Sequence, residues 1–171
     1  MKENFDKCLA MLLVHEGGYS NHVKDKGGAT MLGVTQAVYE KWVGRDVTID
    51  EMKALTPADV GPIYKNNYWD RGKCDDLVSG LDWSVFDMYV NSGNRSAKIL
   101  QGLVAAKKDG AIGPKTLAAV EDHDPEELIE GFHRGRQDFY EGLNTFDTFG
   151  RGWTRRNKET LEQSMDMLAD Y

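Results

Sequence analysis

Apolar residues near the start of the chain recur with the period of a helix. They are spaced by three and four positions: Phe5, Cys8, Leu9, Leu12 and Leu13. This spacing places them on one face and predicts an amphipathic helix over residues 3–15. Gly17 supplies a position at which helices commonly end, so the helix is expected to run out at Glu16, which Gly17, Gly18 and Tyr19 follow.

Spacing and capping signals predict further helices along most of the chain. Thr35, Thr48 and Thr56 stand at N-cap positions, with a capping box to Glu51 and with Pro57 at a first helical position. The expected helices begin near residues 35, 48, 56, 81, 97, 115, 125 and 153. The stretch 81–91 is apolar at helical spacing and is expected to be central and buried, whereas the Gly-rich residues 16–34 predict a loop or short hairpin.

The expected fold class is therefore mostly α, of the α+β kind, with many short helices around a central buried helix and a small lobe near residues 16–34. A chain of 171 residues fits one domain. Within it, residues 1–90 are expected to form a catalytic half and residues 91–171 a helical half packed on it.

Composition removes several classes of function. The net charge of −7 argues against a general nucleic-acid binder. No stretch is apolar and long enough to span a bilayer, and the run over residues 8–14 lacks a signal-peptide cleavage site. We therefore expect a protein made in the cytoplasm, with no membrane insertion.

No metal or cofactor is expected. Cys8 and Cys74 are too few for a disulfide framework and predict thiols in a reducing compartment. His15-Glu16 resembles the start of a zinc-binding His-Glu-x-x-His helix, but Tyr19 occupies the place of the second histidine. The other histidines have no ligand spacing: His22, His123 and His133.

Glu16 is the main candidate for chemistry. It lies at the negative end of a helix dipole, where the protonated form that a general acid needs is favoured. Asp25 follows across the Gly-rich loop, and two carboxylates flanking one cleft are what glycoside hydrolysis requires. The alternatives are a solvated glutamate at a helix end and an aspartate in a turn. Thr30 could help to hold a water molecule.

Aromatic residues offer faces for stacking on sugar rings. Tyr19 follows Glu16, and Tyr68 and Trp69 form the pair that best suits a cleft. Aromatic residues at helical spacing are nevertheless more often part of the core than of a binding surface.

In its motifs and their order the chain resembles the phage and prophage N-acetylmuramidases of glycoside hydrolase family 108, which have a lysozyme-like fold. In the first half these motifs are Glu16-Gly17-Gly18-Tyr19, Asp25-Lys26-Gly27-Gly28-Ala29-Thr30, Gly33-Val34-Thr35-Gln36, Ile63-Tyr64, Tyr68-Trp69-Asp70, and Phe86-Asp87 with Val90-Asn91. In the second half, residues 109–117 and 149–153 resemble the peptidoglycan-binding region that usually accompanies that family. The resemblance covers nearly the whole chain.

The resemblance implies an endolysin that cleaves the β-1,4 bond between N-acetylmuramic acid and N-acetylglucosamine. Glu16 would be the catalytic acid and Asp25 the candidate second carboxylate, with Tyr19, Thr30, Tyr68, Trp69 and Asn91 as substrate-binding residues. Its partners would be bacterial glycan strands. The enzyme is expected to be a monomer that depends on a separate holin, acting on the cell wall or in the periplasm once the membrane is permeabilised.

Two other functions stay open at the level of sequence. A lytic transglycosylase also uses one glutamate, often with a downstream Gly-x-x-Gln segment that Gly33-Val34-Thr35-Gln36 matches, and it does not need Asp25. A non-catalytic peptidoglycan-binding or virion protein would keep the fold alone.

Overall fold

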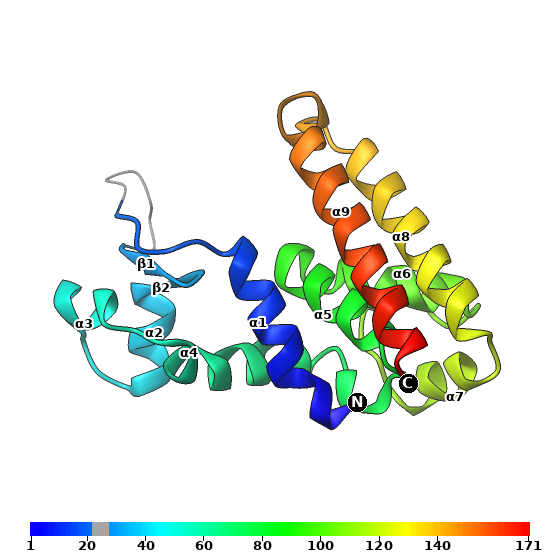
Figure 1. Ribbon diagram of the computed structural model, residues 1–171, viewed down its shortest axis with the longest axis horizontal. Helices are drawn as coiled ribbons and strands as arrows, with labels where there is room; N and C mark the ends of the chain where they lie inside the picture. The colour runs from blue at the N-terminus through cyan, green and yellow to red at the C-terminus, as the bar shows by residue number, and fades with distance from the viewer. Residues whose placement is uncertain (22–27) are drawn as a thin grey trace. The chain divides into compact units, whose positions relative to one another are not determined.

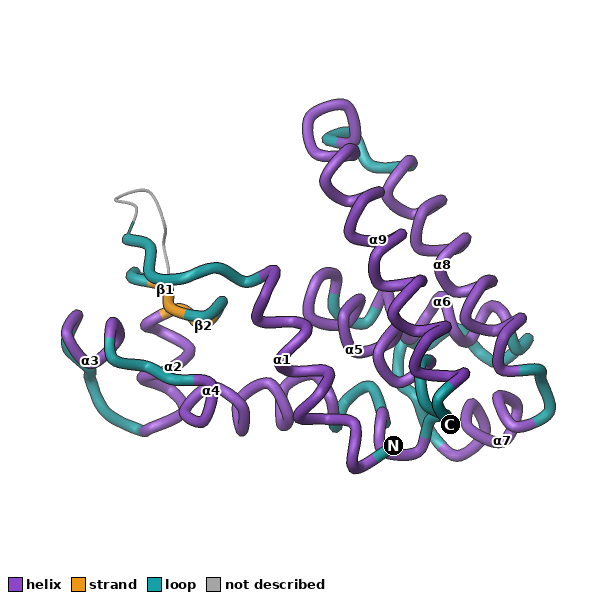
Figure 2. The backbone as a smooth tube through the Cα atoms, in the orientation of Figure 1, coloured by secondary structure: helices purple, strands orange, loops and turns teal. Residues whose placement is uncertain are grey.

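The computed structural model describes residues 1–21 and 28–171. The expected fold class is confirmed: 68% of the described residues are helical, and they form nine α-helices and one small antiparallel hairpin (Figures 1 and 2). Packing divides the chain into two compact units. One comprises Phe5–Asn67, and the other comprises Met1–Asn4 with Tyr68–Tyr171.

The unit Phe5–Asn67 begins with the predicted amphipathic helix, α1 (Phe5–His15). Its buried residues are Cys8, Leu9 and Leu12. The helix packs against α4 (Pro57–Tyr64). Gly61 permits this close crossing, because a Cβ there would lie only 3.2 Å from a methyl group of Leu9.

Local capping signals set the boundaries of the short helices in this unit. Thr35 accepts a hydrogen bond from the Val38 N–H at the start of α2 (Gln36–Val43), which ends at Gly44 with φ +75°. The predicted capping box of Thr48 and Glu51 opens α3 (Ile49–Lys53). Such caps satisfy backbone donors that the first turn leaves unpaired.

A two-residue turn joins the strands β1 (Thr30–Met31) and β2 (Val34–Thr35), drawn in orange in Figure 2. Its residues, Leu32 and Gly33, have φ +50° and +76°, as the tight turns that suit a twisted hairpin require. Ser20 pairs with Thr30 on the other side of β1, through backbone hydrogen bonds of 2.8 and 2.9 Å.

In the second unit, a buried helix, α5 (Leu81–Ser92), packs against α6 (Arg95–Leu103), α8 (Pro125–Glu141) and α9 (Phe146–Ala169). This confirms the expected central helix. The helices α8 and α9 lie side by side as an antiparallel pair (Figure 1). The last helix begins at Phe146, ahead of the expected Trp153.

The expected boundary between the halves, at residues 90 and 91, falls inside α5. Because α5 packs against the three later helices, the compact unit already begins at Tyr68. A π-helical turn, η2 (Lys65–Trp69), spans the start of this unit at Tyr68. Two short 3₁₀ turns, η1 (Lys2–Asn4) and η3 (Cys74–Asp76), and the helix α7 (Pro114–Glu121) are its remaining elements.

A buried ionic cluster lies in the core of this unit. Asp87 is fully buried and pairs with Arg136 at 2.7 Å and with Arg156 at 2.8 Å. Burial alone would raise the pKa of the Asp87 carboxyl, but the two guanidinium groups outweigh it and hold that pKa below its ordinary value. Arg156 lies in a basic stretch of the sequence, residues 151–158, but its guanidinium group forms an ion pair with Asp87 in the core.

Among the described residues, no helix combines the length and apolar character needed to cross a membrane. Nor do those residues include a group of three or more His, Cys, Asp or Glu side chains placed to hold a metal ion. Cys8 and Cys74 are both buried.

Candidate active site

Glu16 is the first residue after α1, and it is half-buried. Gly17 follows with φ +48°, a left-handed conformation that a glycine adopts without strain and that turns the chain out of the helix. The sequence thus predicts the position of this carboxyl group correctly, at the end of an amphipathic helix.

The hairpin turn lies directly against the Glu16 side chain. A Cβ built on Gly33 would lie 2.8 Å from Glu16 Oε2 and 3.1 Å from Glu16 Cβ, and it would also meet the Tyr64 hydroxyl. The absence of a side chain at Gly33 therefore makes room for both groups. The turn and the Glu16 carboxyl are held together by close packing.

Tyr64, the last residue of α4, completes this arrangement. Its side chain is buried, and its hydroxyl donates a 2.8 Å hydrogen bond to the Leu32 carbonyl in the turn. Three elements thus meet at one point: the end of α1, the hairpin turn and the end of α4. A carboxyl held half-buried beside a tyrosine hydroxyl is suited to proton transfer at a bound substrate.

Gly33 and Tyr64 have no place among the site residues expected from sequence. Both belong to segments that the sequence highlights, but no local pattern shows that the Tyr64 hydroxyl reaches a turn 32 residues away. The contact depends on the crossing of α1 and α4, which is a property of the folded chain.

Tyr19 and Thr30 lie in the same unit as Glu16. Tyr19 is half-buried, and the Lys53 ammonium lies 5.1 Å from the centre of its ring. Thr30 is half-buried in β1, with its backbone N–H and carbonyl both paired to Ser20. Their roles in substrate binding stay predictions. Asp25, the expected second carboxylate, lies outside the described residues, and its role stays a prediction too.

The Gly-x-x-Gln segment has a structural explanation in this chain. Gln36 donates a 2.8 Å hydrogen bond from its side-chain amide to the Val47 carbonyl. Its side-chain oxygen lies 2.9 Å from where a Cβ of Gly28 would be. Gln36 thus ties the start of α2 to the neighbouring loops.

Three expected substrate-binding residues belong to the other unit. Tyr68 is half-buried in the π-helical turn. Asn91 is exposed at the end of α5, where its side-chain oxygen accepts a 2.7 Å hydrogen bond from the Tyr140 hydroxyl. Both stay candidates.

Trp69 requires a correction. Its side chain is completely buried, its ring packs edge-on against Phe86 at 5.3 Å, and its indole N–H donates to Asp75 at 2.7 Å. A ring enclosed in this way has no open face for a sugar, so Trp69 is a core residue. Helical spacing of aromatics points to the core in this case, as it usually does.

Two protein-family models match successive parts of the chain. The family model described as Glycosyl hydrolase 108 matches residues 9–93, and the model described as Predicted Peptidoglycan domain matches residues 95–158. No curated protein matches the chain. Twelve chains of solved structures match it.

Among them is the structure of Brucella abortus SagA, to which this chain is 40% identical. The similarity covers 98% of this chain and 97% of that one, with a TM-score of 0.85. The resemblance to glycoside hydrolase family 108 is therefore confirmed: the chain belongs to glycosyl hydrolase family 108, and it is a glycosidase that acts on peptidoglycan, with a peptidoglycan domain following the hydrolase domain.

Proposed function

We propose that this protein is an N-acetylmuramidase that hydrolyses the β-1,4 bond between N-acetylmuramic acid and N-acetylglucosamine, with Glu16 as the general acid. The observation that carries the proposal is the placement of the Glu16 carboxyl at the end of α1, against the turn at Gly33 and near the Tyr64 hydroxyl. Glu16 would protonate the glycosidic oxygen as the bond to the leaving sugar breaks.

The reaction also needs a group that stabilises the positive charge developing on the sugar or directs water to it. Asp25 would either position the attacking water or stabilise the oxocarbenium-like transition state. This assignment rests on the resemblance of Asp25 to the aspartate of the family motif, together with its position in the sequence after Glu16.

The test compares the parent, Glu16→Gln and Asp25→Asn on purified peptidoglycan, with soluble fragments analysed by mass spectrometry. We expect fragments with reducing N-acetylmuramic acid ends from the parent and a loss of about 10²- to 10⁴-fold in rate from Glu16→Gln, since the amide keeps the shape but has no acidic proton. Glu126→Gln, an exposed glutamate on α8, is the matched control and should retain full activity.

Each other outcome contradicts a defined part of the proposal. Anhydro ends on the fragments would identify a lytic transglycosylase. Full activity of Asp25→Asn would refute the two-carboxylate mechanism and favour that alternative. Cell-wall binding by both parent and Glu16→Gln, with no fragments from either, would identify a binding protein.

The place of action is part of the same proposal. The apolar run over residues 8–14 lies inside α1, where Cys8, Leu9 and Leu12 are buried, which supports a segment retained in the mature enzyme. We infer that the enzyme is a monomer made in the cytoplasm and needs a separate holin to reach the wall.

This inference is tested by expression in bacteria. Expression of the enzyme alone should leave the cells intact, and co-expression with a holin should lyse them; lysis without the holin would contradict the inference. The phage origin stays a prediction.

A further inference from the structure

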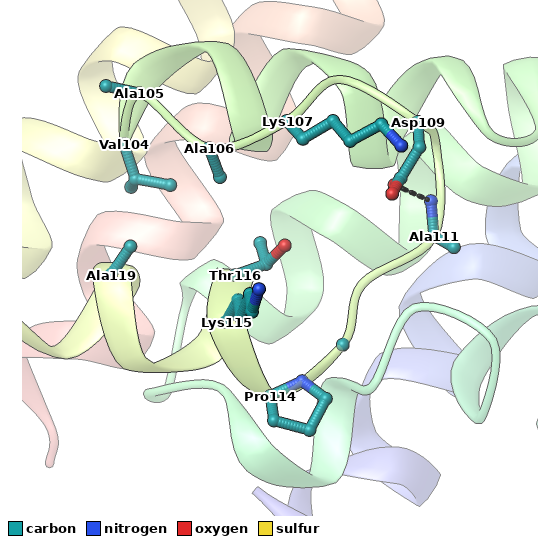
Figure 3. A pocket seen from close by; sticks show the side chains of 11 residues that line it. Val104, Ala105, Ala106, Lys107, Asp109, Ala111, Pro114, Lys115, Thr116 and Ala119 are labelled. Carbon is teal, nitrogen blue, oxygen red and sulfur yellow. Dashed lines mark hydrogen bonds between the residues drawn. The ribbon is translucent and has the colours of Figure 1, made fainter.

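A cavity of about 750 Å³ lies between the end of α6, the loop after it and α7, within the peptidoglycan domain (Figure 3). Small apolar groups form most of its wall, including Val104, Ala106, Ala111 and Ala119. Pockets that bind small molecules have volumes of roughly 300–1,000 Å³. The cavity thus has the size and the apolar lining of a ligand site.

The loop that forms one wall is fixed by a buried side chain. Gln101 is 1% exposed, and its amide donates to Asp109 at 2.8 Å and to the Ala111 carbonyl at 3.1 Å. Its oxygen accepts from the Gly110 N–H at 2.9 Å. A further lining residue, Ala105, has φ +52°, a conformation that an alanine rarely adopts. The wall is therefore held in shape before any ligand arrives.

The charges at the cavity favour an anionic ligand, although the chain as a whole carries −7. Lys107 and Lys115 line it and are exposed. The one acidic lining residue, Asp109, is occupied: its carboxylate accepts from Gln101 and from the Ala111 N–H at 3.0 Å (Figure 3). These hydrogen bonds, that of Gln101 first, hold the pKa of Asp109 below its ordinary value. The charge of Lys107 contributes to this lowering, so Lys107 partly compensates Asp109. The lining nevertheless carries two positive charges against one negative charge, which favours a ligand carboxylate.

We propose that this cavity binds the acidic stem peptide of peptidoglycan, which adds to the proposed function a separate contact for the peptide beside the one for the glycan. The small apolar walls suit the methyl groups of alanine residues, and the two lysines suit the carboxylates of the stem. None of the described residues that line the cavity is aromatic, so it offers no stacking face for a sugar. This inference depends on the proposed function in one respect only, namely that the polymer bound by the protein is peptidoglycan.

Binding is tested by nuclear magnetic resonance of the full, ¹⁵N-labelled chain with the soluble peptide L-alanyl-γ-D-glutamyl-meso-diaminopimelate. We expect shifts of the amides over residues 104–119, and about tenfold weaker binding by the double variant Lys107→Gln with Lys115→Gln, since each lysine supplies a charge-assisted contact. The control variant Lys7→Gln with Lys41→Gln, an equal change of charge at exposed positions on α1 and α2, should leave the affinity within about twofold.

Three results would overturn the inference: shifts confined to residues outside the cavity, equal affinity of the double variant and the parent, or shifts over 104–119 caused by chitotetraose but not by the peptide.

A second experiment distinguishes failure of this inference from failure of the proposed function. It uses glycan strands from which an amidase has removed the stem peptides. The parent and the double variant should cleave such strands equally, and Glu16→Gln should not. Absence of cleavage by the parent would refute the muramidase activity, while binding of the peptide would still be measured independently.

Discussion

At the scale of single residues, the candidate site depends on a position that has no side chain. Gly33 combines a left-handed backbone with φ +76° and close packing against Glu16 and Tyr64. A larger residue would strain the turn and would also push against the groups proposed to carry out or support the chemistry. These two effects can be separated, because the chain contains a second glycine with nearly the same φ and open surroundings, Gly44.

Gly33→Ala is expected to lose about 10²-fold in the rate of fragment release, because displacing a catalytic group by about 1 Å has an effect of that order. Its positive φ should also lower the free energy of unfolding by about 1 kcal/mol. The measurements are the initial rate on purified peptidoglycan and the unfolding free energy from urea titration.

Gly44→Ala is the matched control. Its φ is +75°, and no atom lies within 4 Å of the added Cβ. We expect the same loss of about 1 kcal/mol from backbone strain with the activity of the parent. Equal rates for the two folded variants would show that contact between the turn and Glu16 has no part in catalysis.

At the scale of elements, the helices could be predicted where their signals are local. The caps at Thr35, Thr48 and Thr56 are specified by residues close to them in the sequence, and each lies at the start of a helix in the structure. The end of α1 at Glu16 is equally local. These signals were sufficient to locate the proposed acid.

Elements whose geometry depends on distant contacts could not be predicted in the same way. The hairpin turn has Gly33 where such turns favour glycine, but Leu32 at φ +50° stands where they favour Asn or Asp. The sequence therefore predicts a loop or short hairpin over residues 16–34 without locating its turn. Tyr64 reaches this turn only once α4 crosses α1. Burial of Trp69 agrees with the general tendency of aromatic residues at helical spacing, but its partners Phe86 and Asp75 could not be identified from that spacing.

At the scale of the whole molecule, sequence families and packing divide the chain at different places. The Glycosyl hydrolase 108 match extends to residue 93, whereas the compact unit begins at Tyr68. The helix α5 accounts for the difference, because it belongs to the hydrolase match by sequence and packs with the later helices. The polar groups of α5 are therefore part of the core that stabilises the peptidoglycan domain.

A buried histidine that contacts one of these groups, Ser84, gives the molecule a predictable response to acid. His133 on α8 is 3% exposed, with Nε2 3.0 Å from the Ser84 hydroxyl and Nδ1 2.7 Å from Asn157 Oδ1. The Asn157 oxygen can only accept, so Nδ1 carries the proton of a neutral ring. Burial disfavours the charged ring and lowers the pKa of His133 to about 4, against an ordinary value of 6.5.

The direction of the pH effect follows from proton binding. Between pH 6.5 and 4 the unfolded chain binds a proton at His133 and the folded chain does not, so stability falls as the pH falls through this window, by about 3 kcal/mol in all. Asp87, whose pKa in the folded chain lies below its ordinary value of 3.8, begins to contribute to the loss only at the lower end of this window, and it is present in both proteins compared below. Urea titrations at intervals from pH 7 to 4 should show this slope in the parent and a shallower one in His133→Gln. The absolute stability of the variant does not enter the comparison, because only the change with pH is read. Parallel curves for the two proteins would mean that His133 is protonated in the folded core, and the hydrogen bonds to Ser84 and Asn157 would then not be those of a neutral ring.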